Sequence, residues 1–473
     1  MKKYKKLLFA SLLSAVLLLV SCNSKTEQKS TVEIDENGFA VLTDAEVENL
    51  VKRAYQYVAL YNVNNKFAIT QGGWNTLLAD TKLKDHTLTD IARPNNDSFY
   101  TGIMLDLRKE PYIVTLPKFD SKYVSLMVTA YDHYVHVPKA TRLGDFQKEE
   151  KILFYSERTE NYKGEDVGGV DDVFLANGDF ISVVFRVMPH ANEPERFEKV
   201  VSQIGQIKME SLSEFKGKER IALGEVDFPP VGQSDGDIFE NNLLEVMQFV
   251  FNHLSFDEAI EEDKQVLSAF KPLGLAPGKE FNPETAVKID GKRFREMSEK
   301  VFTEYMSSMA DPNTATRLAP RIFKPKGQTD LEALITVSVI GPIGLPLDEA
   351  YYPAVNTTDG SQMNAMNDYV IKMTKDELPP AKAFWSLTLY DKANGFFIPN
   401  DYKKYSVGEN GGMKLNEEGG IEVYIAAEKP EGIPEENWLP INRGDEDLDI
   451  LLRVYVPELD KISDWKVPNA DKL

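Results

Sequence analysis

The chain has 473 residues and carries a formal net charge of −21 at pH 7. This length predicts two or three domains, and such an acidic surface disfavours nucleic acid as a partner. The single cysteine excludes internal disulfides and a metal site built from cysteines.

The first 22 residues have the pattern of a bacterial lipoprotein signal peptide. A lysine-rich start precedes an apolar core, Leu7 to Val20, and Leu19-Val20-Ser21-Cys22 ends it as a lipobox. The core has 14 residues, fewer than the roughly 20 that a spanning helix needs. We therefore predict lipidation of Cys22 and attachment to the lipid bilayer of the bacterial cell envelope, facing the periplasm or the cell surface. Residues 23–42 are predicted to be a flexible tether.

Residues 43–189 predict a β unit that begins with a helix. Asp44 to Tyr61 has apolar residues at helical spacing, and Thr43 or Asp44 can cap its start. Short β-branched and aromatic segments follow, separated by turn residues, which is typical of a β-sandwich. The predicted strands are Ile113–Leu116, Val124–Tyr131, Ile152–Tyr155 and Phe180–Met188.

Residues 190–335 predict a mainly helical connector, because helical periodicity replaces the alternating pattern. The last unit, 336–473, returns to a β pattern, starting with Val337–Pro346. Phe384 to Tyr390 alternates with large apolar groups on both faces, which predicts a central strand. Further strands are predicted at Tyr369–Met373, Ile421–Ala426 and Leu451–Val456. The predicted fold class is mainly β with a helical connector (α+β).

Two groups of motifs resemble a known pair of domains. Arg93 to Tyr100, with Leu105-Asp106-Leu107, Lys122-Tyr123 and Tyr131-Asp132, resembles the domain of unknown function DUF1254. Phe384 to Asp391, with Asn400, Tyr405-Ser406, Asn437 to Pro440 and Arg453 to Pro457, resembles its usual partner DUF1214. The resemblance implies an immunoglobulin-like sandwich followed by a jelly-roll-like sandwich, and it implies no agreed activity.

The candidate site residues come from these motifs. Flat rings beside amides and carboxylates suit a small polar or carbohydrate-like ligand, although most buried aromatics belong to a core. Arg93 is expected to be held by Asp97 or Asp106, since a charged guanidinium beside a proline turn needs a carboxylate. The candidates for a ligand site or a structural corner are Arg93, Asn95, Asn96, Asp97, Tyr100, Asp106, Tyr131, Asp132, Trp385, Ser386, Tyr390, Asn437, Trp438 and Arg453.

Other chemistry finds less support in the sequence. Asp132 and His136 would lie roughly 13 Å apart on one strand face, and His133 would point away, so we predict no metal and no cofactor. No Gly-x-Ser-x-Gly motif is present, and Ser386 has no histidine near it in sequence. The main hypothesis is a lipoprotein that binds a small ligand in a cleft between two β domains. A hydrolase acting on an envelope carbohydrate or ester, and a purely structural lipoprotein, remain the alternatives.

Overall fold

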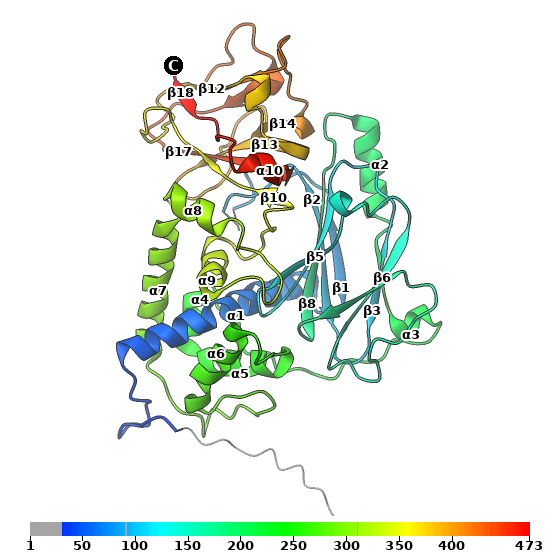
Figure 1. Ribbon diagram of the computed structural model, residues 1–473, viewed down its shortest axis with the longest axis vertical. Coiled ribbons are helices and arrows are strands. Elements are labelled where there is room, and N and C mark those ends of the chain that lie inside the picture. Colours follow the sequence, from blue (N-terminus) through cyan, green and yellow to red (C-terminus); the bar gives the residue numbers. More distant parts are fainter. Residues whose placement is uncertain (1–30, 90–91, 310) are drawn as a thin grey trace, which may run out of the picture.

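A computed structural model describes residues 31–89, 92–309 and 311–473 (Figure 1). The predicted signal peptide, including Cys22, lies outside the described residues. The chain folds into two β units, with helices packed beside the first and below the second (Figure 1). The predicted fold class is confirmed, since each β unit contains two sheets. Among the described residues, no helix is both long enough and apolar enough to cross a bilayer.

The first β unit is a sandwich of a five-stranded and a four-stranded sheet. The five-stranded sheet has the order β1 (Thr76–Asp80), β2 (Phe99–Asp106), β8 (Phe180–Val187), β4 (Val124–Ala130), β5 (Val135–Ala140). The other sheet has the order β7 (Asp172–Ala176), β6 (Glu150–Ser156), β3 (Tyr112–Leu116), β9 (Lys208–Ser211). One apolar core cluster joins both sheets to helix α1. This shared core explains why β4 is buried along its whole length.

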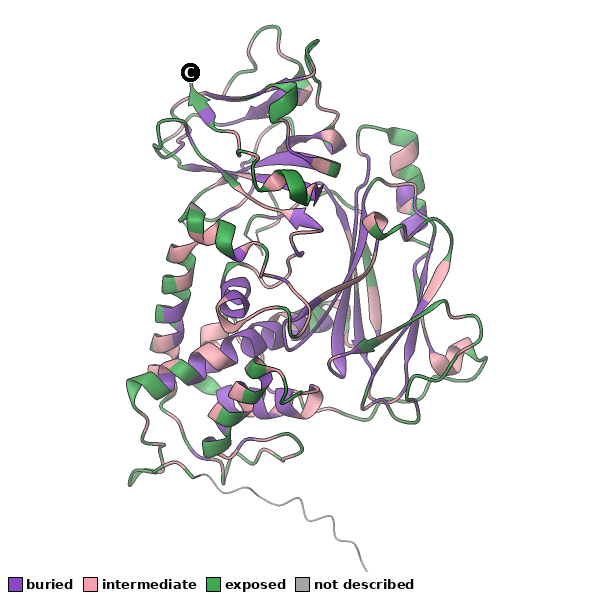
Figure 2. Ribbon diagram, viewed as in Figure 1, coloured by how far each residue is buried: buried purple, intermediate pink, exposed green. Residues whose placement is uncertain are grey.

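Helix α1 runs from Asp44 to Gln71, ten residues past the predicted end at Tyr61. Thr43 and Glu46 form a capping box at its start, as the sequence indicated. The extension passes through asparagines, which favour helices weakly. Tertiary contacts compensate, because the Asn62 amide donates to Asp235 at 2.7 Å and the Asn65 amide donates to the Tyr131 hydroxyl at 3.0 Å. Figure 2 shows that much of α1 is buried.

Five helices pack against α1: α4 (Asp235–Asn241), α5 (Leu243–His253), α6 (Glu261–Phe270), α7 (Gly291–Ser308) and α9 (Leu331–Ile340). Two others, α2 (Pro194–Ile204) and α3 (Leu212–Phe215), lie beside the first sandwich, and α8 (Pro312–Leu318) follows α7 (Figure 1). The expected β segment at Val337–Pro346 is wrong, because α9 occupies its first part and a loop the rest. A short apolar run does not distinguish a buried helix from a buried strand.

The second β unit is also built from two sheets. One has the order β10 (Ala350–Tyr351), β17 (Leu448–Pro457), β13 (Ala381–Asp391), β14 (Ser406–Gly408), and β11 (Ala354–Val355) also pairs with β17. The other has the order β16 (Trp438–Pro440), β15 (Ile421–Ala426), β12 (Tyr369–Met373), β18 (Ala470–Lys472). A short helix, α10 (Leu459–Ile462), follows β17. Strand β13 lies between β17 and β14, which confirms the predicted central strand.

Candidate functional site

The loop of residues 93–98 leaves the first sandwich and contacts β13, β14 and β17 of the second. We call this contact the junction. Asp97 is 1% exposed, and its carboxylate accepts hydrogen bonds from Ser386 Oγ at 2.5 Å and Ser406 Oγ at 3.1 Å. Burial raises the pKa of Asp97 above its usual value, although Arg453 and the two serines act in the opposite direction. Asp97 therefore links the loop to two strands of the other sandwich.

Asn95 makes a second set of contacts from the same loop. Its amide nitrogen lies 2.7 Å from the Tyr455 hydroxyl and 3.2 Å from the Tyr100 hydroxyl. Its carbonyl oxygen accepts from the backbone N–H of Asp97 at 2.8 Å. Asn95 thus fixes the turn and joins a tyrosine of each sandwich. The neighbouring Asn96 is half-buried, and its side-chain oxygen has no hydrogen-bond partner among the described residues.

Arg453, on β17, is 3% exposed and is satisfied by neutral oxygens. It donates to Thr388 Oγ1 at 2.8 Å, to the Tyr390 hydroxyl at 2.7 Å and to the Arg93 carbonyl at 3.1 Å. Tyr390 in turn donates to the Pro94 carbonyl at 2.6 Å. Six predicted site residues therefore meet at the junction: Asn95, Asp97, Tyr100, Ser386, Tyr390 and Arg453.

The predicted carboxylate partner of Arg93 is wrong. Its guanidinium pairs with Asp449 on β17 at 2.7 Å, and the Arg93 side chain is 41% exposed. Backbone geometry explains the difference, because Arg93 has a φ of 52° and its N–H donates to the Gly395 carbonyl of the second sandwich. Asp106 lies at the far end of β2, where Arg108 binds it at 2.8 Å.

The junction contains a buried arginine that the sequence analysis missed. Arg186, on β8, is 3% exposed, and its Cζ lies 5.6 Å from the centre of the Tyr100 ring. It donates to the Ile343 carbonyl at 3.1 Å and points at Met127 Sδ at 3.5 Å. No described carboxylate lies within ion-pair distance of Arg186. A lone arginine inside the apolar segment Phe180–Val187 was the signal that could have revealed it.

A groove of about 620 Å³ opens at the edge of the junction. Both sandwiches line it, through Lys122, Thr141 and Arg142 on one side and Lys382, Val456 and Asp460 on the other. Val456 has a φ of 52°, which is strained for a β-branched residue. Strained residues of this kind cluster at ligand and active sites.

A buried carboxylate lies behind the groove wall. Arg142 pairs with Asp348 at 2.7 Å and also contacts Glu349, which is 0% exposed. Tyr123 donates to Glu349 at 3.1 Å. Burial raises the pKa of Glu349 to about 7, although Arg142 opposes the shift. The polar chain Arg142–Glu349–Tyr123 therefore leads from the groove into the junction.

Comparison with known proteins identifies both β units. A model for the family of proteins of unknown function DUF1254 matches residues 74–210, and a model for the family of unknown function DUF1214 matches residues 348–459. Together the two regions cover more than half of the chain. The chain belongs to the two-domain DUF1254/DUF1214 family. No curated protein matches the sequence.

Two solved structures resemble the fold of this DUF1254/DUF1214 protein. One is the VPA0106 protein from Vibrio parahaemolyticus, with a TM-score of 0.67, 23% identity, and coverage of 90% of this chain and 100% of that chain. The other is an uncharacterised protein from Burkholderia cenocepacia, with a TM-score of 0.42, 13% identity, and coverage of 91% and 95%. At 23% identity, the Vibrio structure supports the fold alone.

The remaining predicted site residues of the DUF1254/DUF1214 protein lie outside the junction contacts. Tyr131 packs beneath α1, and Trp385 belongs to the core of the second sandwich. Asn437 hydrogen-bonds the backbone of Lys414, and the Trp438 indole donates to the Ala426 carbonyl at 2.8 Å. These four side chains therefore stabilise their own units.

The two histidines of the Asp132–His136 segment contact other residues of the fold. Burial lowers the pKa of His133 to about 3, and both of its ring nitrogens have partners, Ser338 and the Pro342 carbonyl. Burial also lowers the pKa of His136 to about 4. Burial raises the pKa of Asp132 to about 6, partly offset by Lys326. Within residues 31–89, 92–309 and 311–473, no group of three or more histidine, cysteine or acidic side chains is placed to hold a metal.

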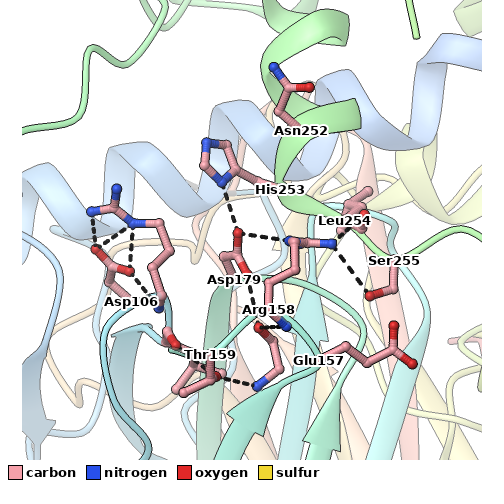
Figure 3. Close-up of polar contacts among 12 residues, drawn as sticks. Asp106, Glu157, Arg158, Thr159, Asp179, Asn252, His253, Leu254 and Ser255 are labelled. Atoms are coloured by element: carbon pink, nitrogen blue, oxygen red, sulfur yellow. Dashed lines mark hydrogen bonds and ion pairs between the residues drawn. The ribbon is translucent and has the colours of Figure 1, made fainter. Parts of the chain in front are cut away.

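A second polar cluster lies between the first sandwich and α5. Figure 3 shows His253 and Arg158 pointing toward Asp179. His253 Nδ1 lies 2.9 Å and Arg158 Nε 3.1 Å from Asp179 Oδ2, while Ser156 Oγ donates to Oδ1 at 2.9 Å. A backbone hydrogen bond lies beside these side chains, in which the Asp179 N–H donates to the His253 carbonyl at 2.9 Å. This Asp179 cluster therefore ties the turn before β8 to the end of α5.

Proposed function

We propose that this DUF1254/DUF1214 protein is a lipoprotein of the bacterial envelope, anchored through Cys22, that binds a small polar or carbohydrate-like ligand in the cleft between its two sandwiches. The observation that carries the proposal is the groove of about 620 Å³, which both sandwiches line. Small-molecule sites commonly have such volumes and occur at domain interfaces.

The polar groups of the junction favour binding over hydrolysis. Ser386 is fully buried, and its hydroxyl donates to Asp97. None of the histidines in the described chain contacts Ser386, because each binds another partner: Tyr405, Ser338, Asn177, Glu193 or Asp179. A serine nucleophile needs an adjacent base. The junction instead holds its side chains in fixed positions, as a binding site requires.

The rim of the groove provides a test of the proposal. The full-length protein in mild detergent would be screened against neutral and acidic sugars and small metabolites by thermal shift, and we expect a ligand to raise the unfolding midpoint. Lys382→Ala, on the rim, should weaken binding of that ligand. Lys372→Ala, a matched exposed lysine on β12, should not.

Two outcomes would contradict the proposal. If no compound raises the midpoint of the wild-type protein, the structural-lipoprotein alternative becomes the better one. If a ligand binds but both lysine variants bind it as the wild type does, the ligand site lies elsewhere than the groove.

A further inference from the structure

Arg186 is short of partners for a buried guanidinium. This group carries five N–H donors and remains charged in proteins. Among the described residues, Arg186 has one carbonyl partner, Ile343, and one sulfur, Met127, which is a weak acceptor. Burying a charge is costly unless a counter-charge and hydrogen bonds compensate. At most two of the five N–H groups of Arg186 therefore have a partner among the described residues.

The other arginines at the junction differ from Arg186 in this respect. Arg453, equally buried, donates to three oxygens and lies within electrostatic reach of Asp97. Arg142 contacts two carboxylates, those of Asp348 and Glu349. Arg93 pairs with Asp449. The fold thus places carboxylates near the other three arginines, whereas no described carboxylate lies within ion-pair distance of Arg186.

Tyrosines surround the Arg186 guanidinium and connect it to the surface. The phenol groups of Tyr100, Tyr123, Tyr352 and Tyr455 lie within its electrostatic reach. Tyr100 and Tyr352 are half-buried. The Tyr352 hydroxyl has no hydrogen-bond partner among the described residues, and its ring meets that of Tyr455 at a centroid distance of 6.5 Å. An anion that enters beside these rings could accept from both Arg186 and Tyr352.

We infer that the ligand of the junction carries a carboxylate, which Arg186 binds with its guanidinium and Tyr352 with its hydroxyl. This inference rests on the proposed function and names the chemical class of its ligand. Arg186 and Tyr352 do not line the groove itself, so the ligand would have to extend from the groove to these two residues. A guanidinium matches a carboxylate in a bidentate geometry. The buried acids Asp97 and Glu349 disfavour a second negative charge nearby, so a monoanionic carboxylate suits the site better than a doubly charged phosphate.

Matched probes test the charge requirement. Binding of D-glucuronate, D-glucose, butyrate and D-glucose 6-phosphate to the full-length protein in detergent would be measured by calorimetry. We expect a carboxylate probe to bind more tightly than D-glucose. Arg186→Met keeps most of the side-chain length and removes the charge, and it should weaken carboxylate binding by at least about 10-fold, the effect of losing one charge-assisted hydrogen bond. Lys372→Ala serves as the control.

Stability separates a binding role from a structural role for Arg186. Without ligand, Arg186→Met should keep or raise the unfolding midpoint, since it removes an under-partnered buried charge. If neither Arg186→Met nor Arg186→Lys folds, Arg186 is structural and the inference is overturned. Arg186→Lys retains the charge but lacks the planar guanidinium that can bind both carboxylate oxygens. It should therefore bind the carboxylate measurably more weakly than the wild type. Equal carboxylate binding by Arg186→Lys and the wild type would overturn the bidentate contact.

The remaining outcomes distinguish the two proposals. If D-glucose and D-glucuronate bind equally, and Arg186→Met binds both as the wild type does, the carboxylate inference fails while the proposed function stands. Tighter binding of D-glucose 6-phosphate than of either carboxylate would overturn the preference for a monoanion. If neither these probes nor the wider screen yields a ligand, the proposed function fails.

Discussion

Glu349 is the residue at the junction whose charge responds to pH near neutrality. Burial raises its pKa to about 7 from the usual value of 4.5, against the effect of Arg142. Between these two values the folded protein holds a proton that the unfolded chain has released. The stability from this proton is therefore complete below about pH 4.5 and is lost as the pH rises through about 7.

Glu349→Gln removes this titration and should change the pH dependence of stability. Relative to the wild type, the variant should gain up to about 3 kcal/mol in free energy of unfolding between pH 5 and pH 8. Urea unfolding of both proteins at the two pH values measures the change. An offset between them that stays constant with pH would show that Glu349 does not titrate in this range.

Arg93 and Asp97 are four residues apart but should differ strongly in their effect on stability. Arg93→Ala removes an ion pair that is partly exposed, and it should cost less than about 1 kcal/mol. Asp97→Ala leaves two serines and the buried Arg453 without their acidic neighbour, and it should cost about 3–5 kcal/mol. Denaturant unfolding compares them, and similar losses would refute this assignment of roles.

Sequence alone could identify the residues of the junction better than their partners. Asp97, Ser386 and Arg453 were selected because their motifs are distinctive, and they do meet. The Arg93–Asp449 pair was missed because its members lie 356 residues apart, and nearest-in-sequence acids are a poor guide to contacts through space. Arg186 was missed because its strand was interpreted by its apolar pattern alone.

Among the elements, β13 gives the sharpest stability prediction. Trp385, on this strand, is 3% exposed and packs within the apolar core of the second sandwich. Trp385→Ala should cost about 3–5 kcal/mol, because it removes a large buried ring and leaves a cavity. Thermal unfolding measures the loss, and an unchanged midpoint would mean that the ring does not contribute to this core.

The Asp179 cluster joins a turn of the first sandwich to the end of α5 and should stabilise their contact. Burial alone would raise the pKa of Asp179, but His253 and Arg158 outweigh it and lower the pKa. The stability from this carboxylate is therefore present above the usual pKa of an aspartate and is lost as the pH falls through the lowered value.

Asp179→Asn should cost about 3–5 kcal/mol at pH 7, because it leaves Arg158 without its buried counter-charge and changes the group that His253 contacts. The difference from the wild type should shrink as the pH falls through the lowered pKa of Asp179, where the wild-type carboxylate also becomes neutral. Hydrogen exchange at the end of α5, measured with unfolding curves, tests both effects. Unchanged protection in α5 would mean that the cluster does not secure this helix.

Elements with a clear periodic pattern could be predicted, and those decided by tertiary contacts could not. Strands β12 and β15 begin and end where the sequence predicted. Helix α1 continues past Tyr61 because Asn62 and Asn65 find partners in α4 and in Tyr131. All residues of helix α9 from Ala333 to Val339 are buried, so this part has no polar face to reveal a helical period, and the β interpretation of Val337–Pro346 could not be rejected.

At the scale of the whole molecule, the proposed lipid anchor would decide where the protein is located. Cys22 is the single cysteine of the chain, so it is the one thiol available for lipidation. Cys22→Ala should abolish incorporation of a radiolabelled fatty acid and release the protein from the membrane fraction. Label retained by the variant would contradict the lipoprotein assignment, and the Lys372→Ala variant controls for expression and handling.

The 93–98 loop binds residues near the end of the chain, so its contacts can form only after those residues have been synthesised. Ser386 and Tyr455, which bind Asp97 and Asn95, follow them by 289 and 360 residues. At ribosomal rates of roughly 5–20 residues per second, the loop waits on the order of 15 to 70 seconds for these partners. During that interval the nascent first half has a polar loop with nothing to bind and an apolar face that Phe384 and Tyr455 will later cover. Chaperones that hold the growing chain, and proteases that sample it, would act in this window, so the yield of folded protein should depend on how quickly the last strands arrive.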